Sequence, residues 1–330
     1  MKDIARDLGI SPMAVSKALR GHLDISKDTR ERVLKRAAEL SYRVDSVARS
    51  LVTGQTFLVG LVVPDLMQSF FAEIASAIAG TLAPAGYHVV ISHTGENAAE
   101  EIANIDLLVS RKVDGLIIAS AQTDDRVLRE LKTPYVLIDR AIAGLNANCV
   151  SAPNEEIGFL ATEHLIQQGC RRIAHLKGTH LSTGTERWQG YLRALKEYRL
   201  KIREEYVIDA GHDDAAGETA MQRLLASSPR PDGVFCFNDP VAVGAMRVIQ
   251  ESGLSIPRDL ALIGVANMHY SDVLSVPLST VDQDTMAMGR QAAQMLLSRM
   301  TTKKPPARRK ILITPRLIIR DSSRRKRHPN

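Results

Sequence analysis

Three short helical segments open the chain, and each is bounded by a residue that favours a turn or a helix end. Ser11 followed by Pro12 is a strong helix start, because serine caps a helix N-terminus and proline is tolerated at its first position. Gly9 supplies a tight turn before this pair, and Ser26 caps the next helix. Helices joined by such a turn predict a helix-turn-helix unit. The expected helices span 3–8, 12–20 and 27–40.

The second expected helix has one apolar face and one polar, basic face. Val15, Ala18 and Leu19 share the apolar face by helical spacing, so they are expected to pack inward. The opposite face can enter a DNA major groove, although a solvated three-helix cap would show a similar pattern. The candidate DNA-binding residues in this helix are Pro12, Met13, Ser16, Lys17 and Arg20. The other expected core residues are Ile4, Ala5, Leu8, Val33, Leu34, Ala37 and Leu40.

The segment that follows makes the pattern specific. Residues 42–51 read Tyr-Arg-Val-Asp-Ser-Val-Ala-Arg-Ser-Leu, and a Thr-Gly pair then leads directly into a hydrophobic strand. Residues 3–52 thereby resemble the headpiece of the LacI/GalR family of bacterial transcription regulators, and the resemblance continues to about residue 323. The chain departs from the family pattern at Leu8, Ala14, Lys17, Arg20, Ser41, Val44 and Asp45.

The resemblance implies a homodimeric, ligand-responsive regulator that binds a near-palindromic DNA operator, most simply as a repressor. It also implies that residues 45–52 form a hinge helix on specific DNA. Leu51 would then insert into the minor groove with Ala48 beside it, and Arg49 would contact the DNA. Two rival classes are a solute-binding protein of a transport system and an enzyme on a doubly wound fold.

After Gly54 the pattern changes to apolar strands that alternate with helices. Alternation at this spacing predicts doubly wound parallel sheets, so the expected fold is α/β with a small all-α domain first. The two similar halves resemble a periplasmic-binding-protein-like core, in which the chain would cross between halves near 152, 282 and 313. The expected domains are a headpiece over 1–54, a core over 57–323 and a tail over 324–330. The expected N-subdomain covers 57–152 and 283–312, and the C-subdomain covers 153–281 and 314–323.

Polar residues at the carboxyl ends of the expected strands are the candidates for ligand binding, because open α/β sheets bind ligands at that edge. Asp139, Asn238 and Asp239 follow two such strands. Asn238 has an alternative role as the cap of the next helix. The resemblance adds Arg187 in an R-x-x-G-Y motif, Gln283 and an aromatic wall. The candidate effector-binding residues are therefore Phe70, Asp139, Arg187, Asn238, Asp239 and Gln283.

One departure from the family pattern bears on the ligand. Where the family carries an aspartate after a strand, this chain has Ala266. The change removes an acceptor for sugar hydroxyls and one negative charge, which favours an anion against Arg187. We expect a small sugar-like effector, and a sugar acid or phosphosugar rather than a neutral sugar. Asn267 or His269 could instead restore contact with a neutral sugar.

The distribution of charge also points to a polyanionic partner. Residues 1–56 hold 11 Lys/Arg against 7 Asp/Glu, and residues 303–330 hold 11 against 1. Basic ends around an acidic body suit local contact with a polyanion such as DNA. The basic stretch from residue 322 onward has no apolar anchor, so we expect it to be disordered.

Other function classes find little support in the sequence. The 3 cysteines show no metal-ligand spacing, and no nucleophile motif, zinc motif or phosphate-binding loop is present. We therefore expect no enzymatic activity, no cofactor and no metal site. No apolar run is long enough to span a membrane, and the chain opens without a signal-peptide pattern. The expected location is cytoplasmic, without membrane contact.

Overall fold

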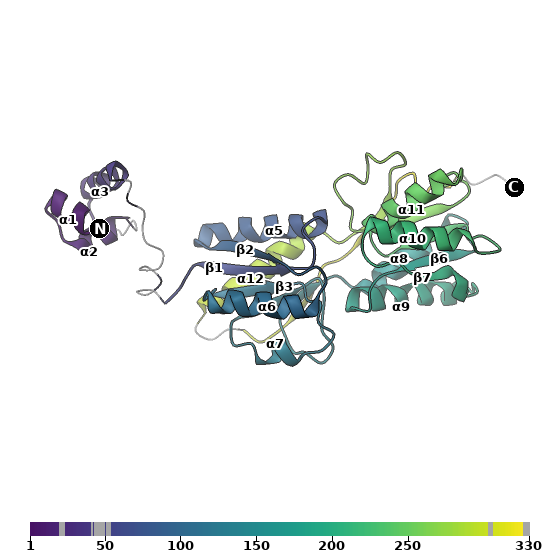
Figure 1. Cartoon of the computed structure of the whole chain (residues 1–330), viewed down its shortest axis with the longest axis horizontal. Coiled ribbons are helices and arrows are strands. Elements are labelled where there is room, and N and C mark those ends of the chain that lie inside the picture. Colours follow the sequence, from purple (N-terminus) through teal and green to yellow (C-terminus); the bar gives the residue numbers. More distant parts are fainter. Residues whose placement is uncertain (20–23, 41, 43–49, 51–53, 303–305, 326–330) are drawn as a thin grey trace. The chain divides into compact units, whose positions relative to one another are not determined.

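The computed structural model describes residues 1–19, 24–40, 42, 50, 54–302 and 306–325, and it divides into two compact units (Figure 1). The first unit is Met1–Thr56 and the second is Phe57–Asn330. Along the part of the chain that is described, no helix is long and apolar enough to cross a membrane.

The described residues of the first unit include three helices, and polar caps set where two of them begin. Ser11 Oγ accepts the Ala14 N–H at 3.1 Å, and Ser26 Oγ accepts the Thr29 N–H at 3.2 Å. Gly9 ends the first helix with φ 63°, a conformation that glycine adopts without strain. The helices are α1 (Lys2–Leu8), α2 (Pro12–Leu19) and α3 (Lys27–Glu39).

The core of this unit is smaller than the sequence predicts. The fully or nearly buried apolar residues are Ile4, Ala5, Val15, Ala18, Val33 and Ala37. Leu34 and Leu40, which were expected to pack inward, are exposed, so that prediction was wrong. Val33 and Ala37 define the inward face one turn apart, and Leu34 is rotated by about 100° from that face. The expected hinge over 45–52 lies outside the described residues, except for Ser50.

The described part of the second unit contains two six-stranded sheets, and its strands confirm the predicted α/β class with parallel, doubly wound sheets. The first sheet has the order β11-β5-β4-β3-β1-β2, and the second has the order β12-β10-β9-β8-β6-β7. Strand pairs in both sheets are parallel, except that β12 runs antiparallel to β10. The first sheet comprises β1 (Leu58–Val63), β2 (His88–His93), β3 (Gly115–Ile118), β4 (Tyr135–Ile138), β5 (Cys149–Ser151) and β11 (Lys310–Leu312). The second comprises β6 (Ile173–Lys177), β7 (Val207–Asp209), β8 (Gly233–Cys236), β9 (Ala261–Val265), β10 (Ser279–Asp282) and β12 (Arg316–Ile318).

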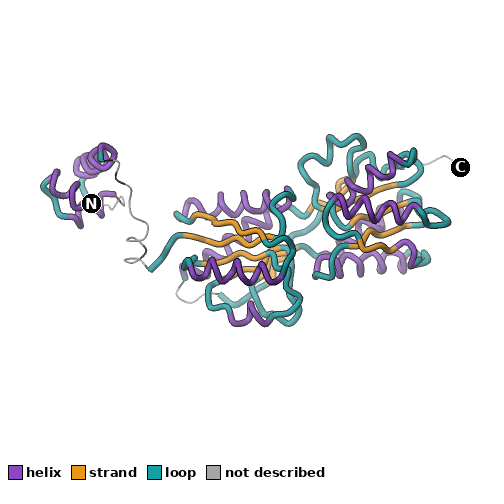
Figure 2. Tube along the Cα trace, viewed as in Figure 1, coloured by secondary structure: helices purple, strands orange, loops and turns teal. Residues whose placement is uncertain are grey.

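Helices cover both faces of each sheet, as Figure 2 shows for the second unit. The central strands are consequently buried and almost entirely apolar, from Leu61 and Ile117 in the first sheet to Phe235 and Ile263 in the second. The helices beside the first sheet are α5 (Ser69–Leu82), α6 (Ala98–Ser110), α7 (Arg126–Glu130) and α12 (Thr285–Thr301). Those beside the second are α8 (Asn154–Gln167), α9 (Ser182–Glu197), α10 (Asp214–Leu225) and α11 (Asp239–Glu251).

The chain passes between the two sheets three times. It leaves the first sheet after β5 for α8, returns after β10 through α12, and crosses again between β11 and β12. Strands β5 and β10 were missed by the sequence analysis, because their sequences, CVS and STVD, contain no apolar run that would indicate a buried strand. These two strands lead directly into crossings, so the missed elements are the ones that connect the halves.

The C-terminal segment is anchored where the sequence predicts disorder. Ser322 Oγ accepts the Ser279 N–H at 2.8 Å and donates to the Leu262 carbonyl at 2.7 Å. Ser323 Oγ lies 2.6 Å from His164 Nε2 and donates to Ser279 Oγ at 2.7 Å. The prediction of disorder was therefore wrong for residues 322–325, because polar bonds replace the missing apolar anchor. Residues 326–330 lie outside the described part of the chain.

Helices α8 and α9 approach so closely that their glycines have no room for a side chain. A Cβ on Gly190 would lie 1.9 Å from the Glu155 carbonyl oxygen. We expect Gly190→Ala to lower the free energy of unfolding by about 1–3 kcal/mol, because the two helices must separate. Gly80 in α5 is the control, since no atom lies within 4 Å of its added Cβ. Gly80→Ala should be neutral or stabilising by up to about 1 kcal/mol in urea unfolding. Equal effects of the two substitutions would contradict the close packing.

Candidate functional site

A cleft with a cavity volume of about 40 Å³ lies between the carboxyl ends of strands from the two sheets. Residues after β4 and β8 face it, as expected for open α/β sheets. Both halves of the second unit therefore contribute to one site. The lining residues are Gln68, Phe70, Phe71, Glu96, Asp139, Arg140, Thr183, Arg187, His212, Phe237, Asn238, Pro240, Val265, Ala266, Met268 and Gln283.

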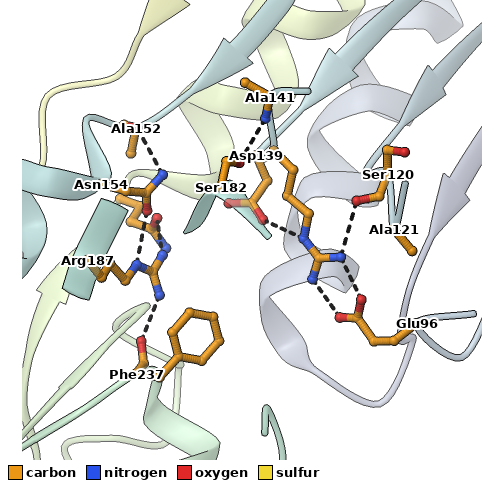
Figure 3. Close-up of polar contacts among 12 residues, drawn as sticks. Glu96, Ser120, Ala121, Asp139, Ala141, Ala152, Asn154, Ser182, Arg187 and Phe237 are labelled. Carbon is orange, nitrogen blue, oxygen red and sulfur yellow. Dashed lines mark hydrogen bonds and ion pairs between the residues drawn. The ribbon is translucent and has the colours of Figure 1, made fainter. Parts of the chain in front are cut away.

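The Arg187 guanidinium lines this cleft, is buried, and is held by neutral acceptors (Figure 3). It donates to Asn154 Oδ1 at 3.0 Å, to the Phe237 carbonyl at 2.7 Å and to Gln283 Oε1 at 3.0 Å. A guanidinium has five N–H groups, so two have no acceptor among the described residues. Burial lowers the pKa of Arg187 to about 10, although the charges of Asp139, Asp239 and Glu186 favour its protonated form.

Backbone packing fixes where Arg187 lies. A Cβ on Gly158 of α8 would lie 2.1 Å from the Arg187 carbonyl oxygen, so α9 rests directly on α8. Asn154, the first residue of α8, then reaches the guanidinium. The Phe237 ring lies beneath the guanidinium, with its centroid 4.8 Å from Cζ. The side chain is thus positioned before any ligand arrives.

The other half of the cleft presents an acid whose bonds are incomplete. Asp139 follows β4 with φ 66°, and its Oδ1 is buried without a hydrogen-bond partner in the described structure. Its Oδ2 lies 3.6 Å from Arg140 Nε, and Arg140 also binds both oxygens of Glu96 at 2.7 and 2.5 Å. Burial raises the pKa of Asp139 above its usual range. Thr183 adds a second buried oxygen, Oγ1, that lacks a described partner.

Asn238 combines the two roles that the sequence leaves open. Its Oδ1 accepts the Val241 N–H at 2.9 Å and so caps α11, while its Nδ2 donates to the His212 carbonyl at 2.8 Å. Asn238 also lines the cleft, as do Phe70, Asp139, Arg187 and Gln283 among the predicted residues.

Asp239 does not line the cleft, contrary to the prediction. It is fully buried, and its carboxylate accepts the Met268 N–H at 3.0 Å, the Ser271 hydroxyl at 3.0 Å and the Thr280 hydroxyl at 2.7 Å. These bonds fix the loop after β9 to strand β10. Position at a strand end indicates the correct edge of the sheet, but it cannot indicate on which side of the backbone the side chain lies.

Position 266 contributes no polar group to the cleft. Ala266 lines it with φ 136°, so the lining there is a methyl group. Asn267 Oδ1 accepts a hydrogen bond from Arg320 Nη2 at 2.8 Å. Neither Asn267 nor His269 lines the cleft. The suggested restoration of a sugar contact by Asn267 or His269 therefore finds no support.

Several lining residues were missed by the sequence analysis. Glu96 and Phe237 come shortly after β2 and β8, so the strand-end rule could have found them. Thr183 and His212 lie at helix starts or loops after β6 and β7, where sequence gives no further signal. The pairing of Glu96 with Arg140 joins residues 44 positions apart, and only the fold brings them together.

In the first unit, the predicted DNA-binding face of α2 is accessible. Pro12 and Met13 are exposed, Met13 by 70%, and Ser16 and Lys17 are half-buried. The Lys17 ammonium forms an ion pair with the Asp24 carboxylate. The remaining predicted DNA-binding residues lie outside the described residues, namely Arg20, Ala48, Arg49 and Leu51.

Two family models match the chain, one in each unit. The model for bacterial regulatory proteins of the lacI family matches residues 1–45, and a periplasmic-binding-protein-like domain matches residues 162–323. The ribose operon repressor of Haemophilus influenzae is 34% identical, with 98% of each chain covered. The transcriptional repressor PurR of Haemophilus influenzae strain PittEE is 33% identical over the same shares.

Solved structures with the same fold are also similar over nearly the whole chain. The lac repressor dimer bound to operator and the anti-inducer ONPF has a TM-score of 0.86 at 25% identity, covering 97% of this chain and 98% of that one. The transcriptional regulator CelR in complex with cellobiose has a TM-score of 0.74 at 28% identity, covering 97% and 98%. Both chains span the headpiece and the core together.

The two buried aspartates beside the cleft should respond differently to the same substitution. Asp239→Asn places an amide where the carboxylate accepts three donors, so we expect a loss of about 1–3 kcal/mol in the free energy of unfolding. Asp139→Asn should cost little or stabilise, because it removes a buried charge whose Oδ1 has no described partner. Asparagine also tolerates the positive φ at 139. Urea unfolding of both variants makes the comparison, and a larger loss at Asp139 would contradict these roles.

Proposed function

This chain belongs to the lacI family of bacterial regulatory proteins, and we infer that it represses transcription as a dimer controlled by a small molecule in the cleft. It is a DNA-binding transcription regulator, since relatives that match 98% of its length are repressors and not enzymes. A transport protein is disfavoured because the match to those relatives includes the helix-turn-helix unit. The proposed details are the operator geometry, the dimer and the ligand.

The ligand proposal rests on hydrogen-bonding groups in the cleft that have no partner in the described structure. Arg187 has two N–H groups to offer, and Asp139 Oδ1 and Thr183 Oγ1 are buried without described partners. Buried polar groups in proteins are normally paired, so such groups around a cavity indicate a ligand that completes them. Phe70 and Phe237 supply apolar walls. A small molecule with both polar and apolar surface suits this lining.

The charges suggest which polar groups that molecule carries. Arg140 is neutralised by Glu96 and Asp139, whereas Arg187 has no ion pair within the described structure. An acidic group on the ligand would gain a charge-assisted bond to Arg187. Hydroxyl groups would donate to Asp139. We therefore propose a sugar acid or phosphosugar as effector, and the methyl group of Ala266 leaves Arg187 without a competing carboxylate there.

Coupling from cleft to DNA is proposed to run through the crossings. The Ala141 N–H donates to Ser182 Oγ at 3.1 Å, and Arg187 binds Gln283 in the second crossing, so both contacts join the halves. A ligand that bridges Asp139 and Arg187 would favour one relative position of the halves over another. The first half follows the headpiece directly in the chain, and its first residue, Phe57, donates its N–H to Asp114 Oδ2 at 2.8 Å.

For DNA recognition we propose that α2 reads the major groove through Pro12, Met13, Ser16 and Lys17, with Arg20 beyond its described end. The segment 45–52 would form the hinge helix. Its proposed minor-groove contacts are Ala48, Arg49 and Leu51. The headpiece has only a modest net charge, with 11 basic against 7 acidic residues. Where the basic side chains lie therefore matters more for DNA binding than the net charge.

Support for a dimer comes from the open edge of the first sheet. Strand β2 lies at that edge, and its Val90 and Ile91 are exposed. An unpaired strand edge with apolar side chains is a surface that proteins usually cover. Two copies related by a two-fold axis would present two α2 helices to the half-sites of a near-palindrome.

DNA recognition predicts two distinct losses. Lys17→Ala should relax the preference at one base position and cost roughly 1–3 kcal/mol there, because a lysine contact to a guanine edge is lost. If Arg49 contacts only phosphate, Arg49→Ala should weaken binding to all DNA sequences alike and lower the salt slope of the affinity by about one unit. Binding-site selection followed by anisotropy titration separates the two, and the selected site should be a near-palindrome. Unchanged base preference for Lys17→Ala would refute its reading role.

The ligand proposal predicts that acids stabilise the core through Arg187. In a thermal-shift panel of neutral sugars, uronic and aldonic acids and sugar phosphates, we expect an acid to stabilise most, by about 2.7 kcal/mol at 100 times its Kd. Arg187→Gln should abolish this stabilisation. Arg193→Gln is the control, because Arg193 lies on the same helix but pairs with Glu155 and Glu156. A neutral sugar that stabilises equally in the Arg187→Gln variant would rule the proposal out.

A further inference from the structure

The face of α2 that is exposed carries a single charged side chain, and that charge is already paired. Lys17 is the only ionisable residue between Pro12 and Leu19. Its ammonium forms an ion pair with Asp24, seven residues later in the turn before α3. The two side chains are 36% and 53% exposed, so both remain within reach of a bound partner.

Folding stability does not account for this pair. Ion pairs between exposed side chains contribute little to stability, because solvent screens them and two flexible side chains must be ordered. The pair instead determines where the Lys17 ammonium lies. An ammonium has three N–H donors, and one directed at Asp24 leaves two for another acceptor. Two donors on one nitrogen suit the O6 and N7 acceptors of a guanine edge.

We propose that Asp24 is a specificity-determining residue of the headpiece, which acts by holding Lys17 in position to read a base. This inference rests on the proposed role of α2 in the major groove. Asp24 does not itself contact a base in this mechanism; it positions the side chain that does. The ligand that the Lys17–Asp24 pair recognises is a guanine edge in duplex DNA.

The physical reason lies in what an untethered lysine can do. A lysine has a flexible four-carbon stem and a compact charge, so it can turn to the nearest phosphate on any sequence. Such contacts strengthen binding to all DNA equally. The pair with Asp24 keeps Lys17 from turning to a phosphate, and the Asp24 carboxylate itself repels phosphates. The pair therefore weakens binding to random DNA while it keeps the contact that depends on sequence.

The test compares two substitutions that remove one negative charge from the same unit. Asp24→Asn frees Lys17, whereas Asp3→Asn breaks an exposed pair with Arg6 in α1 and leaves α2 untouched. Affinities are measured by fluorescence anisotropy for the selected operator and for a random duplex, over a range of salt concentrations. Circular dichroism establishes that each variant is folded.

We expect Asp24→Asn to bind random DNA roughly 3- to 10-fold more tightly, with a salt slope steeper by about one unit. Operator affinity should change less than about twofold, so the ratio of specific to random affinity falls. Base preference should relax at the same position that Lys17→Ala affects. Asp3→Asn should change both affinities alike and by less than about twofold. Asp24→Glu keeps the carboxylate and should behave as the unmodified chain on random DNA.

Equal behaviour of Asp24→Asn and Asp3→Asn would overturn the inference, as would a loss of operator affinity without a gain on random DNA. Tighter random binding by Asp24→Glu would overturn it as well. These outcomes differ from a failure of the proposed function. An unmodified chain without any sequence preference would contradict the role of α2, whereas retained preference with unchanged Asp24→Asn contradicts only the role of Asp24.

Discussion

The buried Arg187 guanidinium is the interaction on which the geometry of the cleft depends. Its charge lies away from water without a paired carboxylate, and burial lowers its pKa to about 10. Such a group persists only where the surroundings hold it, and here neutral oxygens of Asn154, Phe237 and Gln283 do so. These three residues come from α8, the end of β8 and the second crossing. One side chain thereby joins the helix packing to the chain crossing.

The opposite half complements this arrangement in charge and in bonding. Asp139 offers an acceptor without a described partner, while Arg140 and Glu96 form an ion pair beside it. A ligand with hydroxyl groups and an acidic group would contact both halves at once. Its binding energy would then depend on the relative position of the halves, which is the requirement for coupling to a distant DNA site. The chemistry of the cleft and its proposed regulatory role follow from the same two side chains.

The sequence was sufficient for the alternating fold and for part of the cleft, because local patterns mark the strands and their carboxyl ends, whereas Arg187 and Phe70 were predicted from the family resemblance. Buried strands are apolar runs, and Asp139 and Asn238 follow such runs directly. Asp239 was mispredicted because adjacent residues at a strand end can point in different directions, and its bonds to Met268 and Thr280 arise only in the folded chain. Strands β5 and β10 were missed because CVS and STVD contain no apolar run. The anchored segment at 322–325 depends on long-range serine contacts that no composition rule detects.

The most direct test of coupling is the operator affinity with and without a saturating ligand from the acid panel, at fixed salt. If the cleft controls the headpiece, saturation should change the operator Kd by roughly 5- to 150-fold in one direction. The Arg187→Gln variant should bind operator in the absence of ligand but lose this response. A ligand that stabilises the core through Arg187 yet leaves the operator Kd unchanged would contradict control of DNA binding by the cleft.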